Sequence, residues 1–480
     1  APIKGCIIIR PYGYAIWEEI QRVVNAKISA MGAKNVAFPT LVPYSFIARE
    51  KDHVDGFAPE VVVVTHAGGK KLEETYIVRP TSETLIHDAF GRWIRSWRDL
   101  PIRVNQWCSV IRWEKKPKAF IRTGEFWWQE GHTAHETSKE AYEQAYEARA
   151  LYREYITNYL KIPVICGEKP SIERFAGAVA TYTLEAMMRD GKALQMGTSH
   201  VLNQSFAHAF SIQFQNKTGG LDFVHLTSWG VTTRLIGAAI MVHGDQDGLV
   251  LPFDVAPIQF IIIPITKAKD SDAADAVNKR CHELMIMLKK YGYRVEIDTN
   301  DEETPGFKFN KWELKGVPFR IELGARDIEK NVFVLCARDT KEKKIIEWNL
   351  FSQEFIEHVT QEYGDRLFNK AQKRMEENTK EVDLLSNIIS NADSDDDEAV
   401  QKNKTATNNY FWKTSWCCAE ETYPEFKKRF LTVRCILENE KACDVCCIHG
   451  KECENKHNLK KYHGTRQERS QCSKNKKKYT

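Results

Sequence analysis

The pattern of hydrophobic and polar positions changes near residue 254. Before that point, apolar residues at three- and four-residue spacing predict a helix over 17–31, and the capping box Thr137-Ser-Lys-Glu140 begins a second helix that runs to about 160. Extended or β-branched runs predict strands at 36–42 (interrupted by Pro39), 61–64, 75–78, 195–204, 211–215 and 223–227. Because no parallel strand–helix rhythm is present, the pattern predicts an α+β domain with a mainly antiparallel sheet and helices at its edges.

After residue 254, strands alternate with long helices. Strands are predicted at 260–265, 293–298, 319–323 and 332–337, and helices at 272–291 and 353–368. This alternation is typical of a separate α/β domain. Residues 390–398 are acidic and poor in apolar side chains, which indicates a linker or loop. We therefore expect three domains, at 1–253, 254–368 and 369–480, the last a small α+β unit with its acidic linker near 390–400.

Composition is that of a globular protein rather than a disordered or membrane protein, with 42% hydrophobic and 28% charged residues among 480. The longest apolar stretch, at 258–265, is far shorter than the roughly 20 residues that cross a bilayer as a helix. The first residues show no secretory signal, and their abrupt start suggests a trimmed native N-terminus. We expect a cytoplasmic protein that makes no use of a membrane.

Charge and cysteine are concentrated near the C-terminus. Residues 401–480 carry 18 Lys and Arg against nine Asp and Glu, whereas the whole chain has a net charge of only +4. A basic tail suits either a polyanionic partner or a solvated, solubilising role. Eight of the 13 cysteines follow residue 416. Without a signal peptide, such a cluster indicates metal ligands before it indicates disulfides.

Three segments of the first domain carry candidate chemistry, and the first is Arg79-Pro-Thr-Ser-Glu-Thr84. Thr81 or Ser82 can cap a helix that runs to about 97, and Glu83 would then be a favourable first-turn acid. Taken alone, the segment is explained better by helix capping than by ligand binding.

The second segment, 112–132, reads as two strands joined by a basic loop, with Arg112 and Arg122 beside Glu114, Glu130 and His132. A planar guanidinium matches two phosphate oxygens at once, so the arginines suit phosphate binding. Cross-strand ion pairs are the alternative. So many charges on adjacent strands would nevertheless be costly to bury without a function.

The third segment, 227–234, leads from a strand into a helix of small residues that begins near Arg234. The helix dipole disfavours a cation in the first turn by about 0.3–1 kcal/mol. An arginine at that position therefore indicates an anionic ligand.

Together these segments resemble a known family. Phe38-Pro39, Arg112-Trp-Glu114 and Gly230-Val-Thr-Thr-Arg234 resemble the three signature motifs of class II aminoacyl-tRNA synthetases, the first of which forms dimers. The strings at 57–60, 79–84, 105–107, 129–132, 198–200 and 228–230 resemble prolyl-tRNA synthetases of the archaeal and eukaryotic-cytosolic type, which lack an inserted editing domain. The resemblance runs nearly continuously from residue 5 to 368 and implies a homodimer that uses ATP, Mg²⁺, proline and tRNA(Pro).

The resemblance also implies roles for single residues. Arg112 and Arg234 would be catalytic and hold the phosphates of ATP. Further ATP-binding residues would be Glu114, Arg122, Thr123, Gln195, Thr198 and Thr233. The proline pocket would be formed by Thr81, Glu83, Arg112, Trp128, Glu130, His132, Phe175, His200 and Ser228. Two positions depart from the family: Gly124 replaces a basic residue, and Met196 replaces a glycine and is expected to narrow the nucleotide side.

In the second domain, residues 305–327 resemble the anticodon-binding domain of the same enzymes. The residues expected to read the two guanines of proline anticodons are Phe309, Glu313, Arg320, Arg326 and Asp327. Their types fit this task, because arginine recognises the acceptor edge of guanine, carboxylates accept from base amino groups and an aromatic ring stacks on an unpaired base.

The C-terminal unit resembles a small domain that often holds Zn²⁺. Cys417, Cys435, Cys443 and Cys446 form one candidate zinc site, in which Cys443 and Cys446 have favourable spacing. A metal-free domain with free thiols explains the sequence as well, because Thr422 stands where the family has a cysteine. The chain ends on Tyr479-Thr480, one residue beyond the family's terminal tyrosine, so we expect no active-site role for this end.

Two other functions fit parts of the sequence. One is an inactive synthetase-like subunit that only binds RNA or a partner, but the presence of both Arg112 and Arg234 argues against it. The other is a class II synthetase for another amino acid, such as threonine. That enzyme would require a zinc site of Cys and two His in the first domain, which Cys108 and its neighbours do not supply.

Overall fold

The computed structural model describes residues 2–47, 61–266, 271–384, 410–416, 422–428, 431–437, 448 and 476–479. The string at 57–60, the acidic linker near 390–400 and three of the four candidate zinc ligands (Cys417, Cys443 and Cys446) lie outside these residues.

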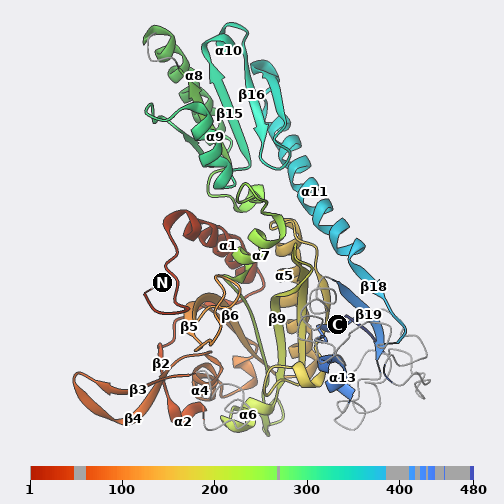
Figure 1. The fold of residues 1–480 in the computed structure, drawn as a ribbon. Helices are drawn as coiled ribbons and strands as arrows, with labels where there is room; N and C mark the ends of the chain where they lie inside the picture. The colour runs from red at the N-terminus through yellow and green to blue at the C-terminus, as the bar shows by residue number, and fades with distance from the viewer. Residues whose placement is uncertain are drawn as a thin grey trace.

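One long sheet forms the body of the molecule (Figure 1). Its first seven strands, in spatial order, are β1 (Lys34–Asn35), β5 (Ile102–Ile111), β6 (Glu125–His135), β12 (His225–Thr232), β9 (Ala193–Asn203), β8 (Ala180–Met187) and β7 (Ile165–Glu168). All neighbouring pairs from β5 to β7 are antiparallel, and only β1 is parallel to its neighbour. The antiparallel sheet expected for the first domain is therefore confirmed.

The C-terminal strands continue this sheet. Beyond β7 follow β20 (Cys435–Leu437), β21 (Lys476–Tyr479), β19 (Phe411–Trp416) and β18 (Thr379–Glu381), and the short helix α13 (Tyr423–Lys428) lies beside them. β20 pairs with β7 through Ile436 opposite Glu168. A Cβ atom on Gly167 would lie 2.3 Å from the carbonyl oxygen of Ile436, so this close approach requires glycine. The last unit is thus joined to the main sheet edge to edge.

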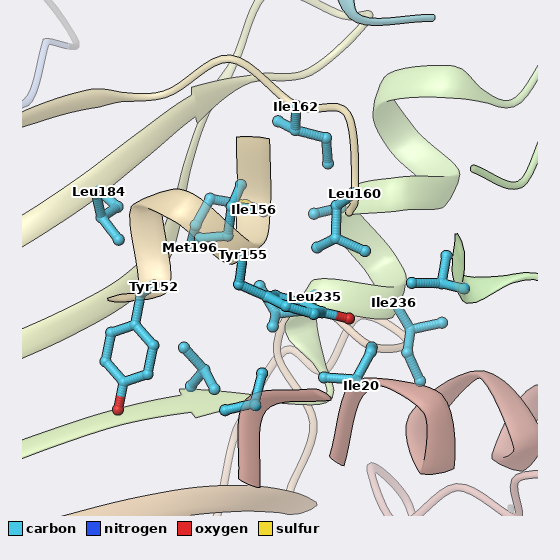
Figure 2. Packing of buried hydrophobic residues seen from close by; sticks show 14 of the residues in the cluster. Ile20, Tyr152, Tyr155, Ile156, Leu160, Ile162, Leu184, Met196, Leu235 and Ile236 are labelled. Atoms are coloured by element: carbon cyan, nitrogen blue, oxygen red, sulfur yellow. The ribbon is translucent and has the colours of Figure 1, made fainter. Parts of the chain in front are cut away.

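Helices cover the sheet and bury its main core. They are α1 (Pro11–Ala30), α4 (Glu83–Trp93), α5 (Ser138–Asn158), α6 (Ser205–Ala209) and α7 (Arg234–His243). α1 begins earlier than predicted because Pro11, whose fixed φ suits the first turn, starts it. The predicted capping box of α5 is confirmed, since Thr137 and Glu140 each accept from the other's backbone N–H at 3.2 Å. Figure 2 shows Tyr155 and Ile156 of α5 packed near Leu235 of α7.

The strand predicted at 36–42 is wrong. The chain forms β1 in the main sheet and then β2 (Leu41–Pro43) in a second sheet with β4 (Lys70–Val78) and β3 (Val62–Ala67). Pro39 lies between them, and a residue without an N–H cannot donate to a strand ladder. The remaining small elements are α2 (Tyr44–Ile47), the hairpin β10 (Gln213–Gln215) and β11 (Leu221–Phe223), and the 3₁₀ turns Trp97–Asp99, Ser171–Glu173, Phe253–Val255 and Trp348–Leu350.

The α/β unit expected after residue 254 is present. Its sheet has the order β14 (Val295–Ile297), β13 (Phe260–Ile265), β15 (Phe319–Gly324), β16 (Val332–Ala337) and β17 (Lys343–Glu347). Its helices are α8 (Ser271–Lys290), α9 (Pro305–Leu314), α10 (Ala325–Glu329) and α11 (Gln353–Glu377). α11 runs beyond the predicted end at 368 and leads directly to β18, back beside the main sheet (Figure 1). Within the described chain, no helix combines the length and apolar character needed to cross a membrane.

Candidate active site

A cavity of about 440 Å³ opens on one face of the main sheet. It gathers residues that the sequence analysis assigned to proline or ATP: Thr81, Glu83, Arg112, Glu114, Arg122, Thr123, Trp128, Glu130, His132, Phe175, Gln195, Thr198, His200, Ser228 and Arg234. Thr233 does not line it. That residue is buried at the N-cap of α7, and its backbone N–H donates to the carbonyl of Trp127 at 2.9 Å.

Strand register places the cavity wall in rows. His132, Ser228, His200 and Thr181 stand opposite one another on β6, β12, β9 and β8. The next row along the strands contains Glu130, Gly230 and Thr198. Since alternate residues of a strand share a face, Trp128, Glu130 and His132 face the cavity together. The residues between them face the core, where Trp229 packs so tightly on Gly131 that a Cβ would lie 2.2 Å from its ring.

One end of the cavity is rich in carboxylates. Thr81 donates its hydroxyl hydrogen to the buried carboxylate of Glu83, and Ser82 rather than Thr81 occupies the N-cap of α4. Of the two capping candidates, Ser82 therefore holds the N-cap position, although its side chain forms no capping hydrogen bond, and Thr81 does not. Across from this pair, the buried carboxylate of Glu130 accepts from the amide of Gln106 at 2.8 Å and lies 3.1 Å from Nε2 of His132.

The pKa values of the two histidines in the cavity wall, His132 and His200, are shifted in opposite directions. Burial disfavours the charged form of His132, but the hydrogen bond and charge of Glu130, with the charge of Glu83, raise its pKa above the usual value. For His200, burial dominates and lowers the pKa to about 4. A neutral His200 lies 3.0 Å from the hydroxyl of Thr181 and packs 4.7 Å, centroid to centroid, from Phe175. This end therefore combines one histidine whose protonation is favoured by Glu130 and Glu83 with a neutral histidine that packs on an aromatic ring.

Ser228 lies between these histidines with its hydroxyl unsatisfied. Its Oγ atom is buried, and among the described residues none forms a hydrogen bond with it. A buried polar group without a partner costs about 1–3 kcal/mol. A ligand in the cavity would supply that partner.

Arginines occupy the other end. The Nε of Arg112 donates to the carbonyl of Pro80 at 3.0 Å, and its guanidinium lies 5.6 Å from the ring centre of Trp128. Arg234 donates from Nε to the carbonyl of Ile121 at 3.0 Å and from Nη1 to that of Gln195 at 3.3 Å. No described carboxylate forms an ion pair with Arg234. Burial and the nearby charge of Arg112 lower its pKa to about 10, so it stays protonated at neutral pH. Two adjacent cations held by carbonyl oxygens form a strong anion site.

Backbone contacts fix the loop around Arg112 and Arg122 at this end. Gly124 accepts from the N–H of Arg112 and donates to the carbonyl of Gly5, each at 2.8 Å. Arg122 itself is 67% exposed and pairs with Glu114 at 3.3 Å. These are backbone contacts that any residue can make, and a Cβ on Gly124 would lie 3.5 Å or more from its neighbours, so the described loop does not require glycine at this position.

Met196, the second departure from the family, borders the cavity from the core side. Its side chain is 2% exposed and belongs to the main buried cluster (Figure 2). The expected narrowing of the nucleotide side by this residue stays a prediction.

The cavity also includes charged residues that the sequence analysis missed: Lys169, Glu173, Arg174 and Arg434. Arg434 precedes β20 in the C-terminal unit, and no motif connects it with the other three, which lie far earlier in the chain. Only the alternation of polar and apolar residues along 431–437 could have marked it as facing a polar surface.

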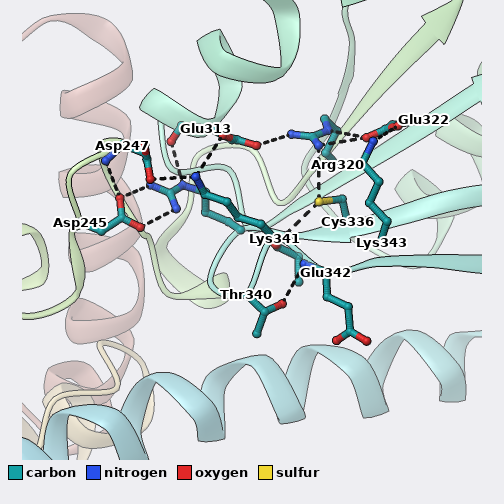
Figure 3. Close-up of polar contacts among 12 residues, drawn as sticks. Asp245, Asp247, Glu313, Arg320, Glu322, Cys336, Thr340, Lys341, Glu342 and Lys343 are labelled. Carbon is teal, nitrogen blue, oxygen red and sulfur yellow. Dashed lines mark hydrogen bonds and ion pairs between the residues drawn. The ribbon is translucent and has the colours of Figure 1, made fainter. Parts of the chain in front are cut away.

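The anticodon candidates form two groups. Arg320 pairs with Glu313 at 2.8 Å, and its guanidinium lies 4.1 Å from the ring centre of Phe309. Figure 3 shows Arg320 between Glu313 and Glu322, the second of which pairs with it at 3.0 Å. Arg326 and Asp327 lie on α10, beyond the far end of β15. Since a strand rises about 3.3 Å per residue, the groups are separated by about 13 Å of β15.

Asp327 also has a structural task. Its carboxylate accepts from the N–H of Gly324 at 2.8 Å and so caps α10. Arg326 in the first turn of this helix is exposed. The two groups can therefore contact successive nucleotides rather than one base.

Of the candidate zinc ligands, only Cys435 lies in the described chain. It is a free, fully buried thiol whose pKa is raised by burial. Across the described residues, no three His, Cys, Asp or Glu side chains are grouped as a metal site. The zinc site stays a prediction.

Comparisons with known proteins agree with this arrangement. Residues 65–243 match the tRNA synthetase class II core domain (G, H, P, S and T), and residues 259–360 match the anticodon binding domain family. The chain is 46% identical over 455 residues to a proline--tRNA ligase 2 of Bacillus cereus, covering 94% of this chain and 90% of the relative. It is 44% identical over 465 residues to proline--tRNA ligase of Borreliella burgdorferi, covering 94% and 91%.

A solved structure is similar over the whole chain. It is the crystal structure of prolyl-tRNA synthetase from Cryptosporidium parvum complexed with halofuginone and AMPPNP, with a TM-score of 0.86 and 38% sequence identity. The match covers 100% of this chain and 93% of that chain.

Proposed function

Because the chain belongs to the prolyl-tRNA synthetases, we propose that its cavity binds proline at the carboxylate-rich end and the phosphates of ATP at the arginine-rich end. The enzyme activates proline with ATP and then transfers the prolyl group to tRNA. The observation that carries our assignment is the polarity of the cavity, with Glu83 and Glu130 on one side and Arg112 and Arg234 on the other.

At the proline end, Glu83 and the hydroxyl of Thr81 receive the secondary ammonium group. Both are buried, so their charge-assisted contacts with the ligand are stronger than they would be in water. The ring of proline packs against Phe175 and the neutral His200. Trp128, His132 and Ser228 complete the wall, and the free hydroxyl of Ser228 gains a partner.

At the ATP end, activation is a displacement at the α-phosphorus. A carboxylate oxygen of proline attacks it, a new P–O bond forms, and the bond to pyrophosphate breaks. Arg112 and Arg234 stabilise the charge that develops on the phosphate oxygens, and their carbonyl contacts hold them in place beforehand. Glu114, Arg122, Thr123, Gln195 and Thr198 position the nucleotide, and Thr233 acts indirectly by starting α7.

In the second step, a hydroxyl of the terminal ribose of tRNA attacks the prolyl carbonyl and AMP leaves. We propose that Phe309, Glu313 and Arg320 read one anticodon base while Arg326 and Asp327 contact its neighbour. The separation of the two groups along β15 supports this division.

We propose two metal ions, Mg²⁺ and Zn²⁺, and the observations that support them differ. Mg²⁺ would arrive bound to the phosphates of ATP, and the carboxylate of Glu114 is a suitable oxygen ligand on that side of the cavity. Zn²⁺ at Cys417, Cys435, Cys443 and Cys446 rests on cysteine spacing alone.

We also propose a cytoplasmic homodimer. The edge strand β1 and the nearby side chains of Leu41 and Trp93 are exposed, and the ring of Phe38 lies 6.0 Å from that of Trp93. A short edge strand with exposed apolar side chains beside it fits a self-association surface. The thiols of the described cysteines are free, as expected in a reducing compartment. Sedimentation of the wild type and a Leu41→Asp variant tests the dimer, which the variant should weaken.

Exchange of labelled pyrophosphate into ATP tests the cavity assignment. Glu83→Gln should raise KM for proline by about 10- to 100-fold because it removes the charge that faces the ammonium group. Glu114→Gln, at the other end, should raise KM for ATP and leave KM for proline unchanged. The opposite pattern would contradict the proposed orientation.

Testing exchange with all twenty amino acids examines the alternatives. Exchange with proline only is the expected result. Exchange with threonine would overturn the substrate assignment, and none at all with folded protein would favour an inactive, RNA-binding subunit.

A further inference from the structure

The C-terminal unit reaches the catalytic cavity through Arg434. This arginine precedes β20, and both its neighbours, Val433 and Cys435, are buried. Its side chain is 25% exposed and borders the same cavity as Arg234. A cation from the last part of the chain thus lies beside a site built from the first part.

Glu185 of β8 holds Arg434 in place. Nε and Nη2 of Arg434 both donate to Oε2 of this glutamate, at 3.0 and 2.8 Å. Its other oxygen accepts from Lys169 at 3.0 Å and from the hydroxyl of Thr183 at 2.8 Å. The side chain of Glu185 is 1% exposed, and although burial raises its pKa, the charges of Lys169 and Arg434 lower it overall. It is therefore ionised and fully used by its partners.

This cluster is connected to the nucleotide end of the cavity. Gln195 stands opposite Glu185 in the β8–β9 ladder and donates from Nε2 to the hydroxyl of Thr183 at 3.2 Å. The carbonyl of Gln195 in turn accepts from Arg234. Gln195 therefore links Arg234 to the cluster around Glu185 through the hydroxyl of Thr183.

The charges in the cluster do not balance. Lys169 and Arg434 share the one carboxylate of Glu185, so these three side chains carry a net positive charge, while the carboxylate of Glu173 lines the cavity nearby. Within the described chain, no residue accepts a hydrogen bond from Nη1 of Arg434. If docking of the C-terminal unit were its only task, one buried carboxylate and one arginine would suffice. The unused Nη1 of Arg434, at the border of the cavity, indicates an anionic ligand.

We propose that Arg434 binds a phosphate group of a substrate, so that the C-terminal unit supplies part of the active site. The inference rests on the proposed orientation of the cavity, with phosphates at the arginine-rich end. Two substrates carry this group, ATP and the acceptor end of tRNA. An arginine held by a carboxylate on one edge keeps its other edge available for phosphate oxygens.

Kinetics of the full-length chain distinguish these sources. If the ligand is ATP, Arg434→Met should raise KM for ATP in pyrophosphate exchange about tenfold without changing KM for proline. If the ligand is tRNA, exchange should stay normal and KM for tRNA in charging should rise by a similar factor. Arg434→Lys, which keeps the charge but loses the planar fork, should show a smaller rise in the same constant.

Tyr423→Phe is the matched control for docking. Tyr423 donates to Glu173 from the same C-terminal unit, but it does not border the cavity. This variant should keep both KM values of the wild type. If Arg434→Met changes neither KM more than the control does, Arg434 is only a docking residue and the proposal is overturned.

Labelling of the wild type gives a result that does not depend on a variant folding. Phenylglyoxal modification of Arg434, mapped by mass spectrometry, should fall when ATP or tRNA is added and not when proline is added. Equal labelling with and without both phosphate substrates would overturn the proposal. If the wild-type chain exchanges pyrophosphate with proline but Arg434 is not protected from labelling, only this inference is refuted. If the wild-type chain shows no exchange at all, the proposed function itself is refuted.

Discussion

Arginine is held differently in the catalytic cavity and in the anticodon-binding unit. In the cavity, Arg234 is fixed by two carbonyl oxygens, and no described carboxylate pairs with it. In the anticodon-binding unit, Arg320 lies between Glu313 and Glu322 (Figure 3). Carbonyl oxygens orient a guanidinium without cancelling its charge, whereas two carboxylates cancel it. The first arrangement suits phosphates, and the second suits the neutral edges of bases, where hydrogen-bond geometry decides.

The same two regions differ in buried histidine, which predicts the largest effect. Burial lowers the pKa of His135 to about 3 and those of His200 and His243 to about 4. Residues 254–384 contain only His282 and His358, and both are exposed. The unfolded chain binds protons at these three histidines below about pH 6.5, while in the folded chain the three resist protonation until about pH 4. Stability present above pH 6.5 is therefore lost as pH falls, by on the order of 3 kcal/mol for each histidine.

Urea unfolding at several pH values, followed by proteolysis and fragment mapping, measures this difference. Between pH 7 and pH 4.5 the catalytic domain should become protease-sensitive at lower urea than the anticodon-binding unit. A His243→Gln variant should lose less stability over the same range than the wild type. Earlier unfolding of residues 254–384 in acid would contradict the comparison.

A second prediction concerns the arginine with uncancelled charge. Arg234→Gln should lower kcat for pyrophosphate exchange by about 10²- to 10³-fold, because it removes a preorganised donor from the site where phosphate charge develops. Arg122→Gln is the control, since that side chain is 67% exposed and already paired with Glu114. The Arg122→Gln variant should lose less than about tenfold in kcat, because solvent screens the charge of Arg122. Equal losses in the two variants would show that preorganisation by carbonyl oxygens adds nothing.

The parts of the catalytic site that follow local rules could be predicted from sequence. Trp128, Glu130 and His132 alternate along β6, and this period places them on one face. The position of Arg234 after a strand and at a helix start likewise indicated an anion site. Both inferences depend only on residues that are close to each other in the sequence.

Contacts between distant segments could not be predicted in this way. Arg434 meets Glu185 only because β20 extends the catalytic sheet beside β7, and no local pattern encodes that pairing. Capping also misled the reading of single residues. Thr81 contacts Glu83 instead of starting α4, whereas Asp327, assigned to the anticodon, does cap its helix. A short polar side chain beside a helix start can either bond to the backbone of the helix or bond to another side chain. Tertiary contacts decide which of these two contacts forms.

The smallest effect is expected where arginine charge is already cancelled. Arg320→Met should lower kcat/KM for charging of tRNA about tenfold, because it would remove the proposed base contact, which is worth roughly 1–3 kcal/mol, and should leave pyrophosphate exchange unchanged. Lys343 still pairs with Glu322 at 2.8 Å, so the variant does not leave that buried acid without a cation. Charging and exchange are measured on the same preparation. An increased salt dependence of charging in the wild type relative to Arg320→Met would instead identify Arg320 as a phosphate contact and remove the distinction between the two regions.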